Sequence, residues 1–172
     1  MTFNKVGIVA LAASAVGAPC AAASFNLPVA ARVIGFVQPP PSGVVLAGIV
    51  YEPGNAASEE EAALIEQQLA AMPAIGHATI KGRRVSAANL GGLAGTRVAF
   101  VTAGVRNQQQ LGEWAAHNGL LTITSDLACV EAARCAVAVS SAARTQITVS
   151  RAAVKAAGLR FGSAFLMLVK EL

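Results

Sequence analysis

The sequence has 172 residues, of which 55% are apolar and 13% are charged, and its formal net charge is +4. This length fits one domain with a single sizeable core. The basic excess is small, and its only cluster is Lys81, Arg83 and Arg84, which argues against nucleic-acid binding because a phosphate backbone needs a long basic stripe.

The amino terminus has the features of a cleavable secretory signal. Lys5 supplies the positive charge, residues 6–16 are apolar, and residues 21–23 are alanines, as in a small-residue cleavage site. We therefore expect a signal peptide over residues 1–23, a mature domain over 24–172 in the periplasm, and loss of Cys20 with the signal. The alternative is an uncleaved anchor. No second apolar run is long enough to span a membrane, so no transmembrane span is expected in the mature chain.

The first half of the mature chain alternates between strand and helix signals. Residues 44–51 are a continuous apolar run typical of a strand buried on both faces. Ser58 and Glu61 predict a capping box that starts a helix ending before Pro73, with the glutamates at 59–61 in its solvated first turn. Strands are predicted near 77–81 and over 97–102, and a short helix or irregular crossover over 85–93.

The second half continues the alternation. A helix over 106–118 leads into a strand over 120–124, and residues 136–140 and 145–149 alternate like a hairpin. Ser150 caps a helix over 151–157, and Ser163 begins a closing helix over 164–172. The predicted fold is a single-domain α/β three-layer sandwich, with a mostly parallel sheet, helices on both faces and an antiparallel hairpin at its edge.

Cys129 and Cys135 are the only cysteines of the expected mature chain. An even count in an oxidising compartment favours a disulfide between them. Free thiols and a metal site are the alternatives, and a zinc ion would lack ligands there because His77 and His117 are distant in sequence.

The sequence contains no recognisable catalytic machinery. The glycine-rich stretch 90–95 runs into a strand and lacks the ending of a phosphate loop, so a turn is the better interpretation. His77 and His117 are assigned structural roles, and no serine, histidine and acid set has supporting context. We expect no enzyme activity, no cofactor and no metal.

Two candidate binding surfaces remain. Lys81, Arg83 and Arg84 could contact an anion, or could protect an exposed edge strand against aggregation. The closing segment has more apolar surface than one core contact requires. It is a candidate interaction surface for a partner or a homodimer, or else a buried helix, and its residues are Phe161, Phe165, Leu166 and Val169.

Residues 119–125 and 145–163 resemble the ending of the YfiR-like periplasmic regulator family, and residues 29–36, 44–51 and 97–102 are similar to its first helix, first strand and a later strand. The chain departs from the family pattern at 37–41 and 129–139. The resemblance implies a periplasmic α/β sandwich, often dimeric and disulfide-containing, that restrains a membrane-bound diguanylate cyclase or a similar sensor, and it carries over no catalytic residues.

Three functional hypotheses follow. The first is a non-catalytic regulator that binds an inner-membrane signalling protein of the cyclase or sensor-kinase type. The second is a single-lobe periplasmic solute-binding protein. The third is an enzyme, which a cleft with strongly perturbed titrating groups would favour.

Overall fold

The structure is a computed structural model that describes residues 25–72, 74–141 and 144–172. The predicted signal peptide and Cys20 lie outside the described residues. Within the described ranges, no helix is both long and apolar enough to cross a membrane.

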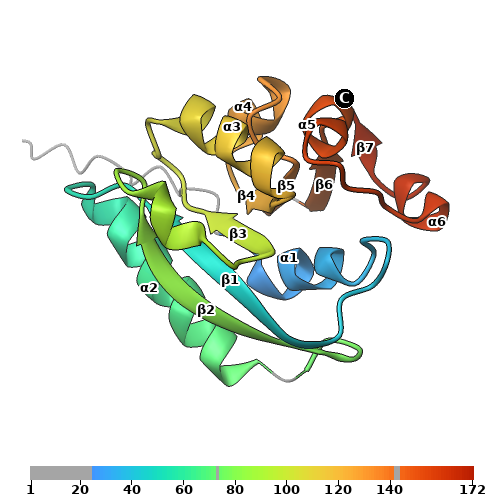
Figure 1. Cartoon of the computed structure of the whole chain (residues 1–172), viewed down its shortest axis with the longest axis horizontal. Coiled ribbons are helices and arrows are strands. Elements are labelled where there is room, and N and C mark those ends of the chain that lie inside the picture. The colour runs from blue at the N-terminus through green and yellow to red at the C-terminus, as the bar shows by residue number, and fades with distance from the viewer. Residues whose placement is uncertain (1–24, 73, 142–143) are drawn as a thin grey trace, which may run out of the picture.

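The strands of the described residues form one sheet, in the order β2-β1-β3-β4-β5-β6-β7 (Figure 1). Neighbouring strands are parallel except for the antiparallel pair of β5 and β6. The α/β fold and its mostly parallel sheet are therefore confirmed, although β7 lies outside the hairpin. The strands are β1 (Gly43–Tyr51), β2 (Ala78–Ser86), β3 (Val98–Val101), β4 (Leu121–Thr124), β5 (Val137–Ser141), β6 (Thr145–Val149) and β7 (Lys170–Glu171).

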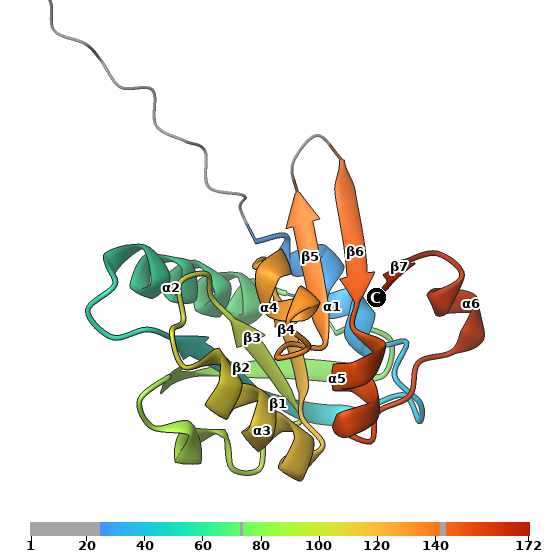
Figure 2. The ribbon, with the colours of Figure 1, turned by 90° about the horizontal axis from the view of Figure 1, so that it is seen from above.

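Helices cover both faces of this sheet, as Figures 1 and 2 show. On one face, α1 and α2 pack on a core that contains Ile49 and Phe100. On the other face, α3 and a short 3-10 helix, η1, pack on a second core that contains Val50 and Val101. The helices are α1 (Leu27–Ile34), α2 (Ala56–Ala71), η1 (Leu90–Leu93), α3 (Gln108–Asn118), α4 (Leu127–Glu131), α5 (Arg151–Ala156) and α6 (Ser163–Leu166).

Local sequence explains most of these elements. All four residues of β3 and all four of β4 are buried, as expected for central parallel strands with both faces covered. Gly119 ends α3 in a left-handed conformation with φ of 63°, which glycine adopts without steric cost. Ser150 caps α5 as predicted, because its side chain accepts a hydrogen bond from the backbone N–H of Ala153.

Two predicted elements differ from the structure. Residues 85–86 continue β2, and η1 follows them, so the crossover is shorter than expected. The closing helix over 164–172 is wrong: α6 ends at Leu166, and β7 pairs in parallel with β6. The backbone N–H of Leu172 donates to the carbonyl of Val149 at 2.9 Å, so pairing with the sheet satisfies backbone groups that a helix would have used.

Candidate functional site

The strand order reverses between β1 and β3. From β1 the chain crosses through α2 to β2 on one side, and β3 then pairs with the other side of β1. In open parallel sheets, ligands bind outside the carboxyl ends of the strands at such a switch point. The loops that follow β1, β3 and β4 therefore form the candidate site.

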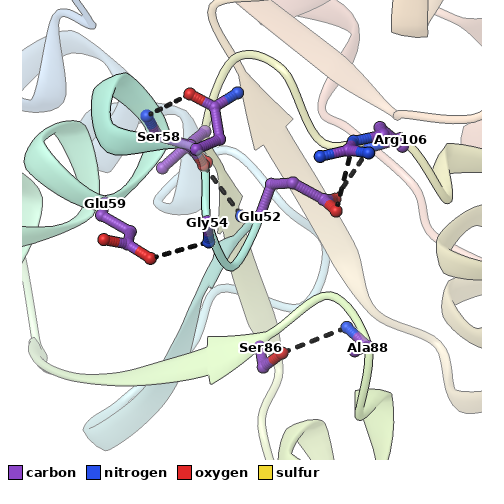
Figure 3. A network of polar contacts seen from close by, with 9 residues as sticks. Glu52, Gly54, Ser58, Glu59, Ser86, Ala88 and Arg106 are labelled. Atoms are coloured by element: carbon purple, nitrogen blue, oxygen red, sulfur yellow. Dashed lines mark hydrogen bonds and ion pairs between the residues drawn. The ribbon is translucent and has the colours of Figure 1, made fainter.

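The loop after β1 is fixed by the start of α2. Asn55, not Ser58, is the N-cap of α2, and its side-chain oxygen accepts a hydrogen bond from the backbone N–H of Ser58 at 3.3 Å. Glu59 reaches back to accept the backbone N–H of Gly54 at 3.0 Å (Figure 3). The prediction of a cap at Ser58 was therefore wrong by one turn, because an earlier asparagine supplies the oxygen.

Ser58 instead connects three elements beneath the loop. Its buried hydroxyl oxygen accepts the backbone N–H of Glu52 at 2.8 Å and lies 2.6 Å from Oγ1 of Thr102. The hydroxyl of Thr102 is also 3.0 Å from the carbonyl oxygen of Val50, to which it donates. These bonds hold the carboxyl ends of β1 and β3 against the first turn of α2.

Glu52 and Arg106 join the loops after β1 and β3. The Glu52 carboxylate accepts the backbone N–H of Arg106 at 3.0 Å and lies 3.5 Å from its Nε (Figure 3). The Glu52 side chain is 15% exposed, whereas that of Arg106 is 74% exposed. The carboxylate is thus fixed in the loop, while the guanidinium keeps donors facing solvent.

Glu61 connects α2 with the loops after β3 and β4. Its carboxylate accepts the backbone N–H of Ala103 at 2.7 Å and the hydroxyl of Ser125 at 3.3 Å. Burial raises the pKa of Glu61 above its ordinary value of 4.5, and the hydrogen bonds from Ala103 and Ser125 oppose that rise. The prediction that Glu61 lies in a solvated first turn was therefore wrong, because its carboxylate is partly buried and bonded to these two loops.

A hollow of about 470 Å³ adjoins the site at the start of α3. Asn107 is the N-cap of this helix but makes no side-chain capping bond. Amides and two guanidinium groups dominate the wall, which suits hydrogen bonding to a polar ligand. The lining residues are Arg106, Asn107, Gln109, Gln110, Glu113 and Arg134.

Among the described residues of this site, neither serine hydroxyl lies beside a histidine. Ser58 is buried against Thr102, and the Ser125 hydroxyl donates to Glu61. His117 lies at the end of α3, where its Nδ1 is 3.0 Å from the carbonyl oxygen of Glu113, and His77 precedes β2. The described residues contain no group of three or more potential metal ligands.

Cys129 and Cys135 form a disulfide bond across α4, in agreement with the pairing favoured from the sequence. Both residues are fully buried and form a small core with Val130 and Ala138. The bond therefore lies beside β5 and closes the turn that carries Arg134, one of the residues that line the hollow.

The candidate interaction surface predicted for the closing segment is largely buried in the structure. Phe161 and Phe165 are only 8% and 2% exposed and belong to the core on the α1 side, and Leu166 and Val169 pack against that core. The short α6 turns these side chains inward. The exposed apolar residues of the segment are instead Met167 and Leu168, which are 80% and 83% exposed.

The structure separates the three predicted basic residues. They lie on the edge strand β2, but Arg84 points toward α2, where its Nε is 2.8 Å from the carboxylate of Glu66. Arg83 donates to the carbonyl of Ala94 at 2.6 Å. Lys81 and Arg83 therefore lie on one face of β2 and Arg84 lies on the other.

Sequence reasoning missed the main residues of the carboxyl-end site: Glu52, Ser58, Thr102, Arg106 and Ser125. One signal was present, because Glu52, Thr102 and Ser125 each follow the last residue of a buried strand by no more than one position. Only the strand order, which the sequence does not state, shows that these ends meet.

No family model and no curated protein sequence matches the chain. Among solved structures, it is similar to the ligand-free, open structure of a substrate-binding protein with adhesive properties from Clostridium difficile, with 11% identity and a TM-score of 0.62. It is also similar to a conserved domain protein from Vibrio cholerae O1 biovar eltor, with 11% identity and a TM-score of 0.64. At this identity the likeness shows a shared fold. It covers 85% of this chain but only 58% and 60% of the other two.

Proposed function

We propose that the chain is a non-catalytic binding protein that holds a small polar solute at the carboxyl end of its sheet. One observation carries this proposal: the loops after β1, β3 and β4 converge at the switch point and are tied together by Glu52, Ser58 and Glu61. The fold shared with a substrate-binding protein supports it.

The ligand chemistry follows from the donors that remain accessible. Arg106 is exposed beside the fixed Glu52 carboxylate, and Arg134 lines the same hollow together with two glutamines. Guanidinium and amide groups donate to carboxylate or hydroxyl oxygens. The proposed solute is therefore small and rich in oxygen acceptors.

A thermal-shift screen tests this function. The protein is exported with its own amino-terminal segment, purified and mixed with panels of carboxylic acids, sugars, amino acids and polyamines. A solute at 100 times its Kd stabilises by about 2.7 kcal/mol, which raises Tm by about 5–10 °C for a domain of this size. We expect the shift from an acid or a polyhydroxylated solute.

The matched variants are Arg106→Ala and Arg151→Ala. Both arginines form an ion pair with a less exposed glutamate, Glu52 and Glu171 respectively, and the two arginines have similar side-chain exposure, at 74% and 72%. Arg106→Ala should remove most of the shift, and Arg151→Ala should keep it. A screen without a shift, or equal shifts in the two variants, would reject the site.

The proposed location is the periplasm. The expected signal over residues 1–23 supports it, and so does the disulfide, since such bonds persist in oxidising compartments. Fractionation should place the protein in the osmotic-shock fluid. Retention in the cytosol with reduced thiols would contradict this location.

A second candidate is the regulator of a membrane-bound cyclase or sensor kinase, as the YfiR-like resemblance implies. The exposed side chains of Met167 and Leu168 favour it, because neighbouring exposed apolar residues are typical of a partner contact. Crosslinking should recover such a membrane protein with the wild type and not with Met167→Glu/Leu168→Glu. Equal recovery with both would reject this contact.

A further inference from the structure

Part of the sheet on the α3 side has no helix over it. Val44 is 61% exposed and Leu46 is 41% exposed, although both lie on β1, which has a neighbouring strand on each side. The helix η1 covers this face of β1 only from Gly48 onward, two residues after Leu46. There a Cβ on Gly48 would collide with the Leu93 side chain. The amino-terminal half of β1 thus presents apolar side chains to solvent.

Two cations flank this apolar strip. Lys81 is the register partner of Leu46 on β2. On the other side, the backbone N–H of Arg97 donates to the Leu46 carbonyl at 3.1 Å, one residue before the pair formed by Ala47 and Val98. Since register partners carry their side chains on the same face, Lys81, Leu46 and Arg97 form a row across three strands. We call Val44, Leu46, Lys81 and Arg97 the cationic strip.

A hollow of about 580 Å³ continues from the cationic strip. Val44 and Arg97 belong to its wall, together with Val37, the prolines at 39–41 and Leu159. Prolines hold this wall with little conformational freedom. The hollow is therefore a recess of mixed character, with apolar side chains beside Val44 and with polar groups that include Gln38, Ser42 and one guanidinium.

The chain supplies no acid to neutralise the strip. All nine of its aspartates and glutamates lie in the described part. None of them belongs to β1, β2 or β3, and none lines the hollow. Two cations beside exposed apolar groups without an internal counter-charge favour a partner that brings the acids.

We propose that the cationic strip and its hollow form a docking site for a segment of a partner protein in which an apolar side chain lies between carboxylates. The apolar side chain enters the recess beside Val44 and Leu46, and the carboxylates meet Lys81 and Arg97. A lipid surface fits less well, because membrane attraction uses clusters of four or more basic residues and a recess accepts side chains, not a flat bilayer.

A displayed library of random peptides tests this proposal, with the exported protein as bait. Selected peptides should share a leucine, isoleucine or phenylalanine flanked by aspartate or glutamate. For a labelled representative peptide, Arg97→Glu and Lys81→Glu should each raise Kd at least about tenfold, and added salt should also weaken binding. Arg84→Glu is the matched control, because it makes the same charge change on the opposite face of β2 and should leave Kd unchanged.

Three results would overturn the proposal. They are a selection without an acidic and apolar consensus, an equal loss of binding in Arg84→Glu, and binding to phosphatidylglycerol vesicles through Arg97 without peptide binding. Leu46→Gln, at an exposed position, gives a second test if a charge reversal prevents folding. Arg97 and Arg106 lie at opposite ends of β3. Arg97→Glu should therefore keep the thermal shift given by the solute. The docking proposal and the solute proposal can thus be rejected independently of each other.

Discussion

Ser58 shows how one side chain positions the candidate site. Its hydroxyl accepts from Glu52 and contacts Thr102, so it fixes the ends of β1 and β3 together. Ser58→Ala leaves the partly buried N–H of Glu52 without this acceptor, and we expect a loss of about 1–3 kcal/mol in the free energy of unfolding. Urea unfolding measures the loss. Ser163→Ala, at an exposed serine, is the control and should change stability little; equal effects in the two would contradict this role.

Glu61 gives a pH-dependent prediction. Because its folded pKa is raised above 4.5 by burial, the folded state binds the proton more tightly, and the charged carboxylate costs stability at neutral pH. That cost falls as pH decreases through the raised pKa and is gone below 4.5. Glu61→Gln is neutral and similar in shape, so it should be more stable than the wild type at neutral pH and equal to it in acid. Urea unfolding at both pH values checks this; a difference independent of pH would contradict it.

The residues of the site were hard to predict because the fold brings them together from distant parts of the sequence. Glu61 and Ser125 are 64 positions apart, and Glu52 and Arg106 are 54 apart. Each has an ordinary local role when considered alone, such as a charge in a helix turn. In contrast, Cys129 and Cys135 could be paired from the sequence, because they are the only cysteines left after the expected cleavage.

At the scale of elements, buried strands and capped helices were predictable, whereas the carboxy-terminal segment was not. β1 and β3 are continuous apolar runs, and β4 alternates an aliphatic residue with the β-branched threonine; local sequence identifies both patterns as strands. Residues 164–172 contain apolar residues compatible with either a helix or a strand. Pairing with β6, a tertiary contact, decides the structure of residues 170–171.

The packing of α3 predicts an unusual glycine effect. Alanine normally stabilises a helix interior by about 1 kcal/mol relative to glycine. A Cβ on Gly112, however, would lie 2.9 Å from the backbone oxygen of Arg134, so Gly112→Ala should instead destabilise by about 1–3 kcal/mol. Gly35→Ala is the control, since its Cβ would meet only the Arg32 oxygen at 3.4 Å. Thermal unfolding compares the two, and a more stable Gly112→Ala would show that the contact relaxes.

The disulfide across α4 should contribute a modest stability. It links residues only 6 apart in sequence, and closing such a short loop stabilises by about 2 kcal/mol in the chain-entropy model. Reduction should therefore lower the free energy of unfolding by about that amount and leave the far-UV circular dichroism unchanged. The Cys129→Ala/Cys135→Ala variant is the control and should not respond to the reductant. Loss of the whole fold on reduction would contradict a local role.

For the whole molecule, the two cores share one sheet. Trp114, the only tryptophan, packs against the core on the α3 side, whereas α1 and α2 pack on the other. Because both faces depend on the same strands, unfolding followed by tryptophan fluorescence and by far-UV circular dichroism should give coincident transitions in urea. Two separate midpoints would show that one layer of helices can detach while the sheet remains.

Charge is also distributed unevenly over the whole molecule. Glu52, Glu59 and Glu61 gather at the carboxyl ends of the strands, and Lys81 and Arg97 lie toward the amino ends. The two proposed sites thus occupy opposite ends of the sheet and use different cationic groups, Arg106 and Arg134 at one end and Lys81 and Arg97 at the other. A solute and a protein segment could bind together without competing for the same groups.

The sheet also has two unequal edges. β2 is nine residues long and pairs on one side only with β1, whereas the opposite edge, β7, is two residues long. Strand addition needs a row of free backbone groups, which only β2 offers at length. In the terms of polymer chemistry the molecule has one long reactive end, so two copies joined through β2 would use both such ends and pairing through this strand would stop at a dimer.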